Sequence, residues 1–131
     1  MDYDAAVSEI REAVPRVISV YLFGSRARGD ANRESDVDLA LLAAVPLDSR
    51  VRFELQERIA TRLRGPVDLI DLRSASAVLR VQVLEHGQVL FDADPSARAS
   101  FEACALAAYA RLNEERAGIL EDVRRTGRVH G

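Results

Sequence analysis

Two aspartates set two residues apart are the first feature of this sequence that could do chemistry. Asp36 and Asp38 open an apolar segment that predicts a strand over residues 36–42, so both carboxylates point to the same face. Like charges held side by side are unfavourable unless a cation lies between them, and aspartate is otherwise depleted from strands. The pair favours a hard divalent cation with oxygen ligands, Mg²⁺ above all. The alternative interpretation is two solvated carboxylates at the start of a strand.

A glycine–serine pair precedes these acids, and ten residues separate Ser25 from Asp36. Gly24 follows an apolar segment and allows the backbone to turn sharply and approach a ligand closely. Ser25 supplies a hydroxyl, and the backbone N–H groups of the next turn point forward, which is typical of phosphate binding. Arg26 and Arg28 add positive charge where phosphates would lie. The alternative is an ordinary strand–helix turn capped by Ser25.

A third acid occurs in the apolar segment 67–72, which is apolar enough to predict a central strand of a sheet. If this strand pairs beside the strand that carries Asp38, one of its acids could reach the same cation. Asp68 and Asp71 point to opposite faces, so only one of them can contribute. We favour Asp68 because it lies near the start of the strand, and Asp71 stays open as the alternative. Three carboxylates and a phosphate-binding turn together indicate two-metal phosphoryl or nucleotidyl transfer.

The hydrophobic pattern predicts the elements that position these residues. Four short apolar segments are expected as strands, and helices are expected between and after them, in one α/β (α+β) domain. Pro15, Gly65-Pro66 and Gly87 mark helix ends. The expected strands are 17–23, 36–42, 67–72 and 88–91; the expected helices are 2–14, 26–28, 49–64, 75–86 and 96–125; and 30–35 is expected as a polar loop.

Composition narrows the class of protein. The chain has 131 residues, enough for one domain, with 48% hydrophobic and 30% charged residues, which excludes a disordered tail. The formal net charge of −3 gives no general attraction to nucleic acid or to anionic membranes. All 18 basic residues are arginine, so a phosphate-binding lysine, a Schiff base and a serine–lysine dyad are excluded.

The single cysteine and the N-terminus indicate in which cellular compartment the protein is expected. Cys104 alone permits no internal disulfide and no cysteine zinc site, and its apolar neighbours predict a buried structural thiol. The acidic N-terminus is unlike a signal peptide, and no apolar segment approaches the length of a membrane span. We therefore expect a soluble protein of the cytoplasm, with no membrane partner.

The complete pattern resembles a known family. The sequence is similar to the minimal nucleotidyltransferases of the polymerase-beta superfamily, and within them to the MNT-domain antitoxins of HEPN/MNT toxin–antitoxin pairs. The likeness extends from about residue 5 to residue 110. It rests on the glycine–serine pair, the ten-residue spacing and the paired acids, and it is carried by segments 23–30, 36–39, 67–72 and 83–91.

This resemblance implies a fold, a site and a reaction. The fold would be a small mixed sheet flanked by helices, forming a single nucleotidyltransferase domain over residues 1–131. Its core would span about 5–93 and its C-terminal helix about 96–125. Gly24 and Ser25 would hold ATP, while Asp36 and Asp38 would bind Mg²⁺ and Asp68 would complete the metal site and help to deprotonate the acceptor. AMP would pass from ATP to a tyrosine of a cognate HEPN ribonuclease toxin.

Two other functions stay open from the sequence. The chain could neutralise its toxin by binding alone, without catalysis, or it could modify a small molecule in the manner of aminoglycoside nucleotidyltransferases. The arginine clusters lack interleaved aromatic residues, so no direct binding of nucleic acid is expected. Arg125 and His130 match the R-x(4–6)-H spacing of HEPN toxins by coincidence, and His86 is interpreted as a residue at a helix C-terminus.

The long C-terminal helix is expected to carry more apolar surface than one small sheet can cover. Part of it could pack on a second copy of the chain, in a homodimer, or on the toxin, in a hetero-oligomer. The alternative is that the helix covers its own core. The stripe is formed by Phe101, Leu106, Tyr109, Leu112, Ile119, Leu120 and Val123.

Overall fold

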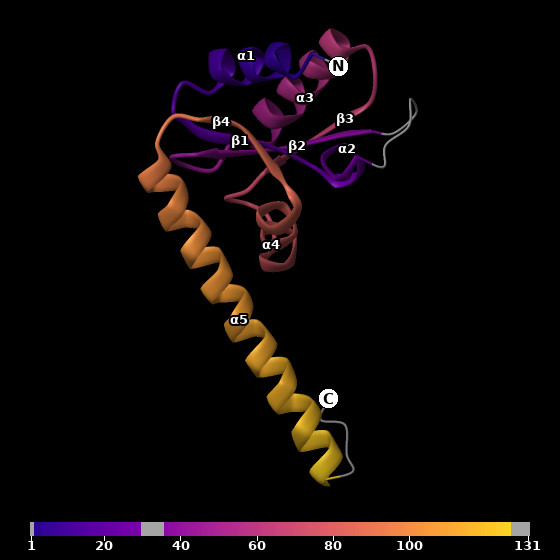
Figure 1. Cartoon of the computed structure of the whole chain (residues 1–131), viewed down its shortest axis with the longest axis vertical. Coiled ribbons are helices and arrows are strands. Elements are labelled where there is room, and N and C mark those ends of the chain that lie inside the picture. Colours follow the sequence, from indigo (N-terminus) through magenta and orange to yellow (C-terminus); the bar gives the residue numbers. More distant parts are fainter. Residues whose placement is uncertain (1, 30–35, 127–131) are drawn as a thin grey trace.

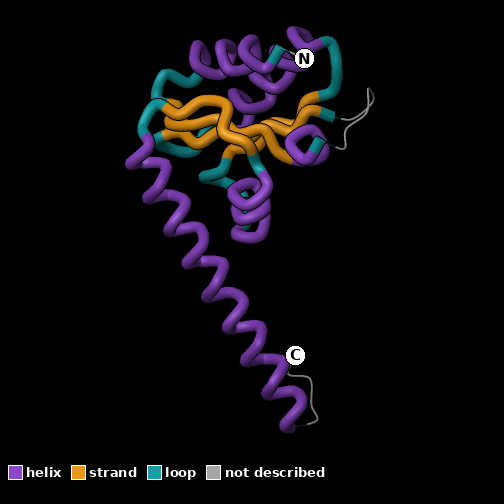
Figure 2. Tube along the Cα trace, in the orientation of Figure 1, coloured by secondary structure: helices purple, strands orange, loops and turns teal. Residues whose placement is uncertain are grey.

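A computed structural model describes residues 2–29 and 36–126, apart from the side chains of Ser25, Arg28 and residues 121–126. The predicted polar loop 30–35 and His130 lie outside the described residues. A mixed four-stranded sheet forms the centre, with helices on both faces, as the sequence predicts (Figures 1 and 2). The elements in chain order are α1 (Tyr3–Ala13), β1 (Val17–Phe23), α2 (Gly24–Arg28), β2 (Val37–Ala43), α3 (Ser49–Leu63), β3 (Val67–Asp71), α4 (Ala77–His86), β4 (Gln88–Asp92) and α5 (Pro95–Thr126).

The strand order β3-β2-β1-β4 determines which strand ends meet. β1 is antiparallel to both β2 and β4, whereas β2 and β3 are parallel and are connected through α3. The end of β1 therefore lies beside the starts of β2 and β3. This shared edge of the sheet is where the candidate residues occur.

Two apolar layers hold the sheet between the helices. On one face, α1 and α3 pack side chains such as Ile10, Leu55 and Ile59 against the odd-numbered residues of β2 and β3. On the other face, α4 and the first turns of α5 pack Val83, Phe101 and Ala105 against the sheet. The even-numbered residues of β2 and β3 face this second layer, because side chains alternate along a strand.

β3 lies at an edge of the sheet, so the prediction of a central strand is wrong. Its outer backbone groups are nevertheless hydrogen-bonded by side chains of α3. The Leu69 N–H donates to Oε1 of Gln56 at 2.9 Å, and Nη1 of Arg52 donates to the Leu69 carbonyl at 3.0 Å. The outward backbone groups of Leu69 are thus paired within the chain, which hinders pairing of this edge with another chain and allows its sequence to be apolar.

The predictions for the bend and for the cysteine need correction. α2 begins at Gly24 rather than at Arg26, so the glycine that ends β1 also opens the helix. Cys104 is exposed, not buried. Phe101 and Ala105 face the core at a spacing of four residues, and the position just before Ala105 is turned away from that face.

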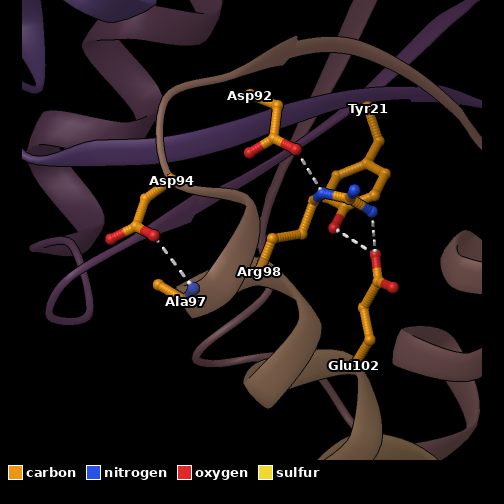
Figure 3. Close-up of polar contacts among 6 residues, drawn as sticks. All are labelled: Tyr21, Asp92, Asp94, Ala97, Arg98 and Glu102. Atoms are coloured by element: carbon orange, nitrogen blue, oxygen red, sulfur yellow. Dashed lines mark hydrogen bonds and ion pairs between the residues drawn. The ribbon is translucent and has the colours of Figure 1, made fainter.

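A polar cluster anchors the start of α5 to the sheet (Figure 3). Arg98 donates from Nε to Asp92 at 2.6 Å and from Nη1 to Glu102 at 2.9 Å. The Tyr21 hydroxyl, from β1, donates to the same Glu102 carboxylate at 3.0 Å. Asp94 caps the helix by accepting from the Ala97 N–H at 3.0 Å. These contacts join three elements and set the direction in which α5 leaves the sheet.

The stability of this anchor is expected to depend on pH through Tyr21, whose side chain is 2% exposed. Burial, with help from Glu102, raises the pKa of Tyr21 to about 12 in the folded state. The neutral phenol is therefore favoured by folding, so its stabilisation is complete below about pH 10 and is lost as the pH rises toward 12. Urea denaturation between pH 9 and 12 should show that the free energy of unfolding falls by at most about 3 kcal/mol. Tyr21→Phe should remove this dependence on pH, whereas Tyr109→Phe should leave it unchanged. If the free energy of unfolding of Tyr21→Phe still falls with pH as in the wild type, the assignment to Tyr21 is wrong.

Beyond its first turns, α5 leaves the body of the molecule and extends for most of its length away from the sheet (Figure 1). At 32 residues it is about 48 Å long. Leu106, Ile119 and Leu120 are 47%, 63% and 60% exposed. The alternative that the helix covers its own core therefore holds only for its start. None of the helices in the described part of the chain could span a membrane.

Candidate active site

The register of β2 and β3 brings two candidate acids together. Asp38 and Asp68 are each the second residue of their strand, and they are directly paired in the parallel ladder. Both alternate with residues of the second apolar layer, so their side chains leave the same face of the sheet. Asp68 is exposed and Asp38 half-buried, while Asp36 is exposed two residues before Asp38. The sequence left open whether these two strands pair, and in the structure they do.

The glycine–serine bend lies against one of these carboxylates. Phe23, the last residue of β1, pairs with Asp38. Gly24 follows with φ +71°, in the left-handed region that favours glycine. A Cβ added to Gly24 would overlap Oδ2 of Asp38 and lie 3.0 Å from its Cγ. Gly24 is therefore required both for the turn and for the space that Asp38 occupies.

The remaining candidates for phosphate binding follow immediately. Ser25, Arg26 and Arg28 belong to α2, one to four residues after Gly24. Arg26 is half-buried, and the side chains of Ser25 and Arg28 lie outside the description. The backbone of α2 therefore starts beside Asp38, at the edge of the sheet where β1 ends.

Asp71, the alternative third acid, has a different environment. It is 4% exposed at the end of β3. Its carboxylate accepts from the N–H groups of Leu47 at 2.7 Å and Arg73 at 3.0 Å, and from the Ser74 hydroxyl at 3.3 Å. These bonds tie the turn after β3 to the segment before α3. Asp68, not Asp71, is the acid beside Asp38.

Replacing Asp71 should therefore affect folding in a way that replacing Asp68 does not. Asp71→Ala leaves two half-buried N–H groups without their acceptor, at an expected cost of about 1–3 kcal/mol in the free energy of unfolding. Asp68→Ala removes an exposed side chain and should change that free energy by less than about 0.5 kcal/mol. Urea denaturation of the two variants measures both. The opposite order of stabilities would show that Asp68 holds the fold.

The described residues do not contain a preformed metal cage. Within residues 2–29 and 36–126, no three acidic, histidine or cysteine side chains lie close enough together to hold an ion. The adjacent carboxylates of Asp38 and Asp68, with Asp36 nearby, offer the hard oxygen donors that Mg²⁺ prefers. The donor chemistry fits the predicted cation, which would have to draw the three acids together.

Two side chains that position Asp68 were not predicted. Arg52 and Gln56 hydrogen-bond the backbone of Leu69, the residue after Asp68, and so hold the edge strand in place. Their spacing of four residues on a predicted helix was the only available signal, and it is common on solvated helix faces.

His86 ends α4, in agreement with its predicted place at a helix C-terminus. Its side chain is exposed, and its Nε2 lies 3.9 Å from Oε2 of Glu85.

The comparisons with known proteins agree with this geometry. Residues 6–96 match the family described as polymerase beta, nucleotidyltransferase. The chain therefore belongs to the polymerase beta nucleotidyltransferase family, as its resemblance implied.

Within the family, the similar proteins include a protein adenylyltransferase and chains from toxin–antitoxin structures. The protein adenylyltransferase MntA of Shewanella oneidensis is 40% identical over 114 residues, which cover 87% of this chain and 81% of that protein. A chain from the crystal structure of a toxin–antitoxin with AMP-PNP superposes with a TM-score of 0.86 at 37% identity, covering 95% of this chain and 99% of that one. A chain from the structure of the tri-AMPylated HEPN toxin of Shewanella oneidensis with its MNT antitoxin gives a TM-score of 0.77 at 36% identity, covering 92% and 94%. The predicted resemblance to MNT antitoxins is thereby confirmed.

Proposed function

We propose that this protein is an antitoxin that transfers AMP from ATP to a tyrosine hydroxyl of a cognate HEPN ribonuclease toxin in the cytoplasm. The observation that carries this proposal is the pairing of Asp38 with Asp68 directly beside the bend at Gly24. Two acids and a phosphate-binding turn in contact are what nucleotidyl transfer requires. The similarity to MntA, and to chains from toxin–antitoxin structures, supports a protein as the acceptor.

The site residues divide into two groups in this proposal. Gly24 and Ser25 hold the triphosphate of ATP through backbone N–H groups and the serine hydroxyl, and Arg26 and Arg28 offset its charge. Asp36, Asp38 and Asp68 hold Mg²⁺. When bound, this ion neutralises charge on the phosphates and orients them for displacement. The whole chain acts as one nucleotidyltransferase domain, with a core over about 5–93 and a C-terminal helix over about 96–125.

The chain's own groups then perform two tasks. The bend at Gly24 fixes the triphosphate tail so that pyrophosphate can leave in line with the attacking oxygen. Asp68, which is exposed on the neighbouring strand, accepts the proton of the acceptor hydroxyl as that oxygen bonds to the α-phosphorus. Bond formation and departure of pyrophosphate thus occur on opposite sides of one phosphorus atom.

The projecting part of α5 is the surface that we assign to the toxin. Its exposed leucine and isoleucine side chains need a partner, and chains that superpose along almost the whole length of this one occur in toxin–antitoxin structures. The same surface would also serve an antitoxin that acts by binding alone. That alternative differs from the proposal only in whether AMP is transferred at the pair of Asp38 and Asp68.

Intact-mass measurement separates the two functions. The purified protein is incubated with ATP, Mg²⁺ and the cognate HEPN protein, whose mass is expected to increase by one or more AMP groups. Chelation of Mg²⁺ with EDTA and the double substitution Asp36→Ala/Asp38→Ala should each abolish the increase. An unchanged toxin mass with the wild-type protein, together with neutralisation that survives in the double variant, would instead establish a non-catalytic antitoxin. Transfer to aminoglycosides but not to the toxin would establish a small-molecule enzyme.

A further inference from the structure

A pocket lies along the outer edge of β3, on the side of the acidic pair away from the bend at Gly24. Its volume is about 240 Å³. The start of α3 forms one wall and the turn between β3 and α4 forms the other. Asp68 belongs to its lining, together with Leu47, Ser49, Ile70, Ala75 and Leu79.

The sheet order places this pocket relative to the reaction. Moving across the sheet, the bend at Gly24 ends β1, Asp38 is on β2, Asp68 is on β3, and the pocket is beyond β3. The triphosphate bend and the pocket therefore lie on opposite sides of the acids. In an in-line displacement, the attacking oxygen and the leaving pyrophosphate are also on opposite sides of the phosphorus. With the triphosphate at the bend, as proposed above, the pocket is on the side from which the acceptor would approach.

The size of the pocket favours one aromatic side chain over a nucleoside. Pockets that bury drug-sized ligands usually measure about 300–1,000 Å³, which is more than this one provides. Leu47, Ile70 and Leu79 supply apolar walls against which a ring can pack.

Within the described part of the chain, some polar groups of the pocket are hydrogen-bonded and one carboxylate is not, and this combination suits a phenol. Nη1 of Arg52 donates to the Leu69 carbonyl, and the Asp71 carboxylate accepts from its three donors, Leu47, Arg73 and Ser74. Among the described residues, none donates a hydrogen bond to the exposed Asp68 carboxylate, which leaves it able to accept one from a ligand. An aromatic ring with a hydroxyl at its end matches this combination of apolar wall and acidic mouth.

We propose that this pocket receives the phenol ring of the acceptor tyrosine of the toxin and brings its hydroxyl to Asp68. The inference rests on the proposed AMP transfer. Asp68 takes the phenol proton, the phenol oxygen bonds to the α-phosphorus of ATP, and the bond from that phosphorus to the bridging oxygen breaks to release pyrophosphate. The pocket thereby selects tyrosine over serine or threonine, whose short side chains cannot fill it.

The test fills the pocket without touching the acids. Ala75→Phe introduces a ring at the wall of the pocket, and Ser49→Trp introduces one from the exposed start of α3. Ala93→Phe is the matched control, because it places the same ring in a separate groove at the opposite edge of the sheet, beside Phe91 and Pro15. For each protein, the time course of AMP transfer to the cognate HEPN protein is followed by intact mass. The affinity for AMP-PNP is measured by calorimetry, and thermal unfolding reports folding.

The expected result is a fall of at least about tenfold in kcat/KM for the toxin in both pocket variants. AMP-PNP affinity should stay within about twofold, and the control should match the wild type. If the pocket variants transfer AMP like the wild type, or lose AMP-PNP affinity as much as transfer, the inference is wrong while the proposed function stands. If Ala75→Phe fails to fold, the Ser49→Trp result decides by the same criteria. Absence of transfer by the wild type would instead overturn the proposed function, and the inference with it.

Discussion

Asp38→Asn is expected to lower the rate of AMP transfer to the toxin by roughly a thousandfold or more. Asparagine has nearly the same shape as aspartate but lacks its charge. Asp38 is paired with Asp68 across the ladder and packs against Gly24, so this acid is in contact with both halves of the site. Removal of its charge should weaken the hold on Mg²⁺ and on the triphosphate beside it. Single-turnover transfer, followed by intact mass, measures the loss.

The matched control for this substitution is Asp94→Asn. Asp94 caps α5 through the Ala97 N–H, and asparagine caps a helix as well as aspartate does. This variant makes the same change in charge far from the site and should transfer AMP at the rate of the wild type. Toxin binding, measured by calorimetry, should be unchanged in both variants because neither position is on the projecting part of α5. Transfer by Asp38→Asn at more than a tenth of the normal rate would exclude a role for this carboxylate in the reaction.

The paired strands show how far a sequence can predict such a site. Alternation along segments 36–42 and 67–72 is a local property with a period of two, so the faces of Asp38, Asp68 and Asp71 followed from the sequence directly. Whether β2 and β3 are neighbours depends on the path of α3 between them, which no local pattern encodes. The family resemblance supplied that connection, and the observed register agrees with it.

The errors have a common physical cause, which is that burial depends on distant parts of the chain. β3 looked central because it is apolar, yet its outer edge is covered by Arg52 and Gln56 from α3. Cys104 looked buried because its neighbours are apolar, yet it lies on the side of α5 turned away from Phe101 and Ala105, which face the core. The direction of α5 is set by the contacts of Arg98 with Asp92 and Glu102, and the sequence offers no signal for it.

Gly24→Ala is the second substitution with a large expected effect, and its cause is steric rather than electrostatic. A side chain at φ +71° costs about 1–2 kcal/mol in backbone strain. The added Cβ would also occupy the position of Asp38 Oδ2, so the carboxylate must move away from the bend. A displacement of about 1 Å at a reacting site can reduce the rate a hundredfold. We therefore expect transfer to fall by about that factor or more, together with a modest loss of stability.

Gly29→Ala separates the two causes. Gly29 has φ +79°, almost the same backbone conformation, but a Cβ added there meets no atom of the described residues within 4 Å. Both variants should lose about the same free energy of unfolding, measured in urea, while only Gly24→Ala should lose AMP transfer. Equal losses of transfer in the two variants would mean that backbone strain in α2 controls activity. A normal rate in Gly24→Ala would mean that contact between the bend and Asp38 is not needed for the reaction, because the carboxylate can leave that position without consequence.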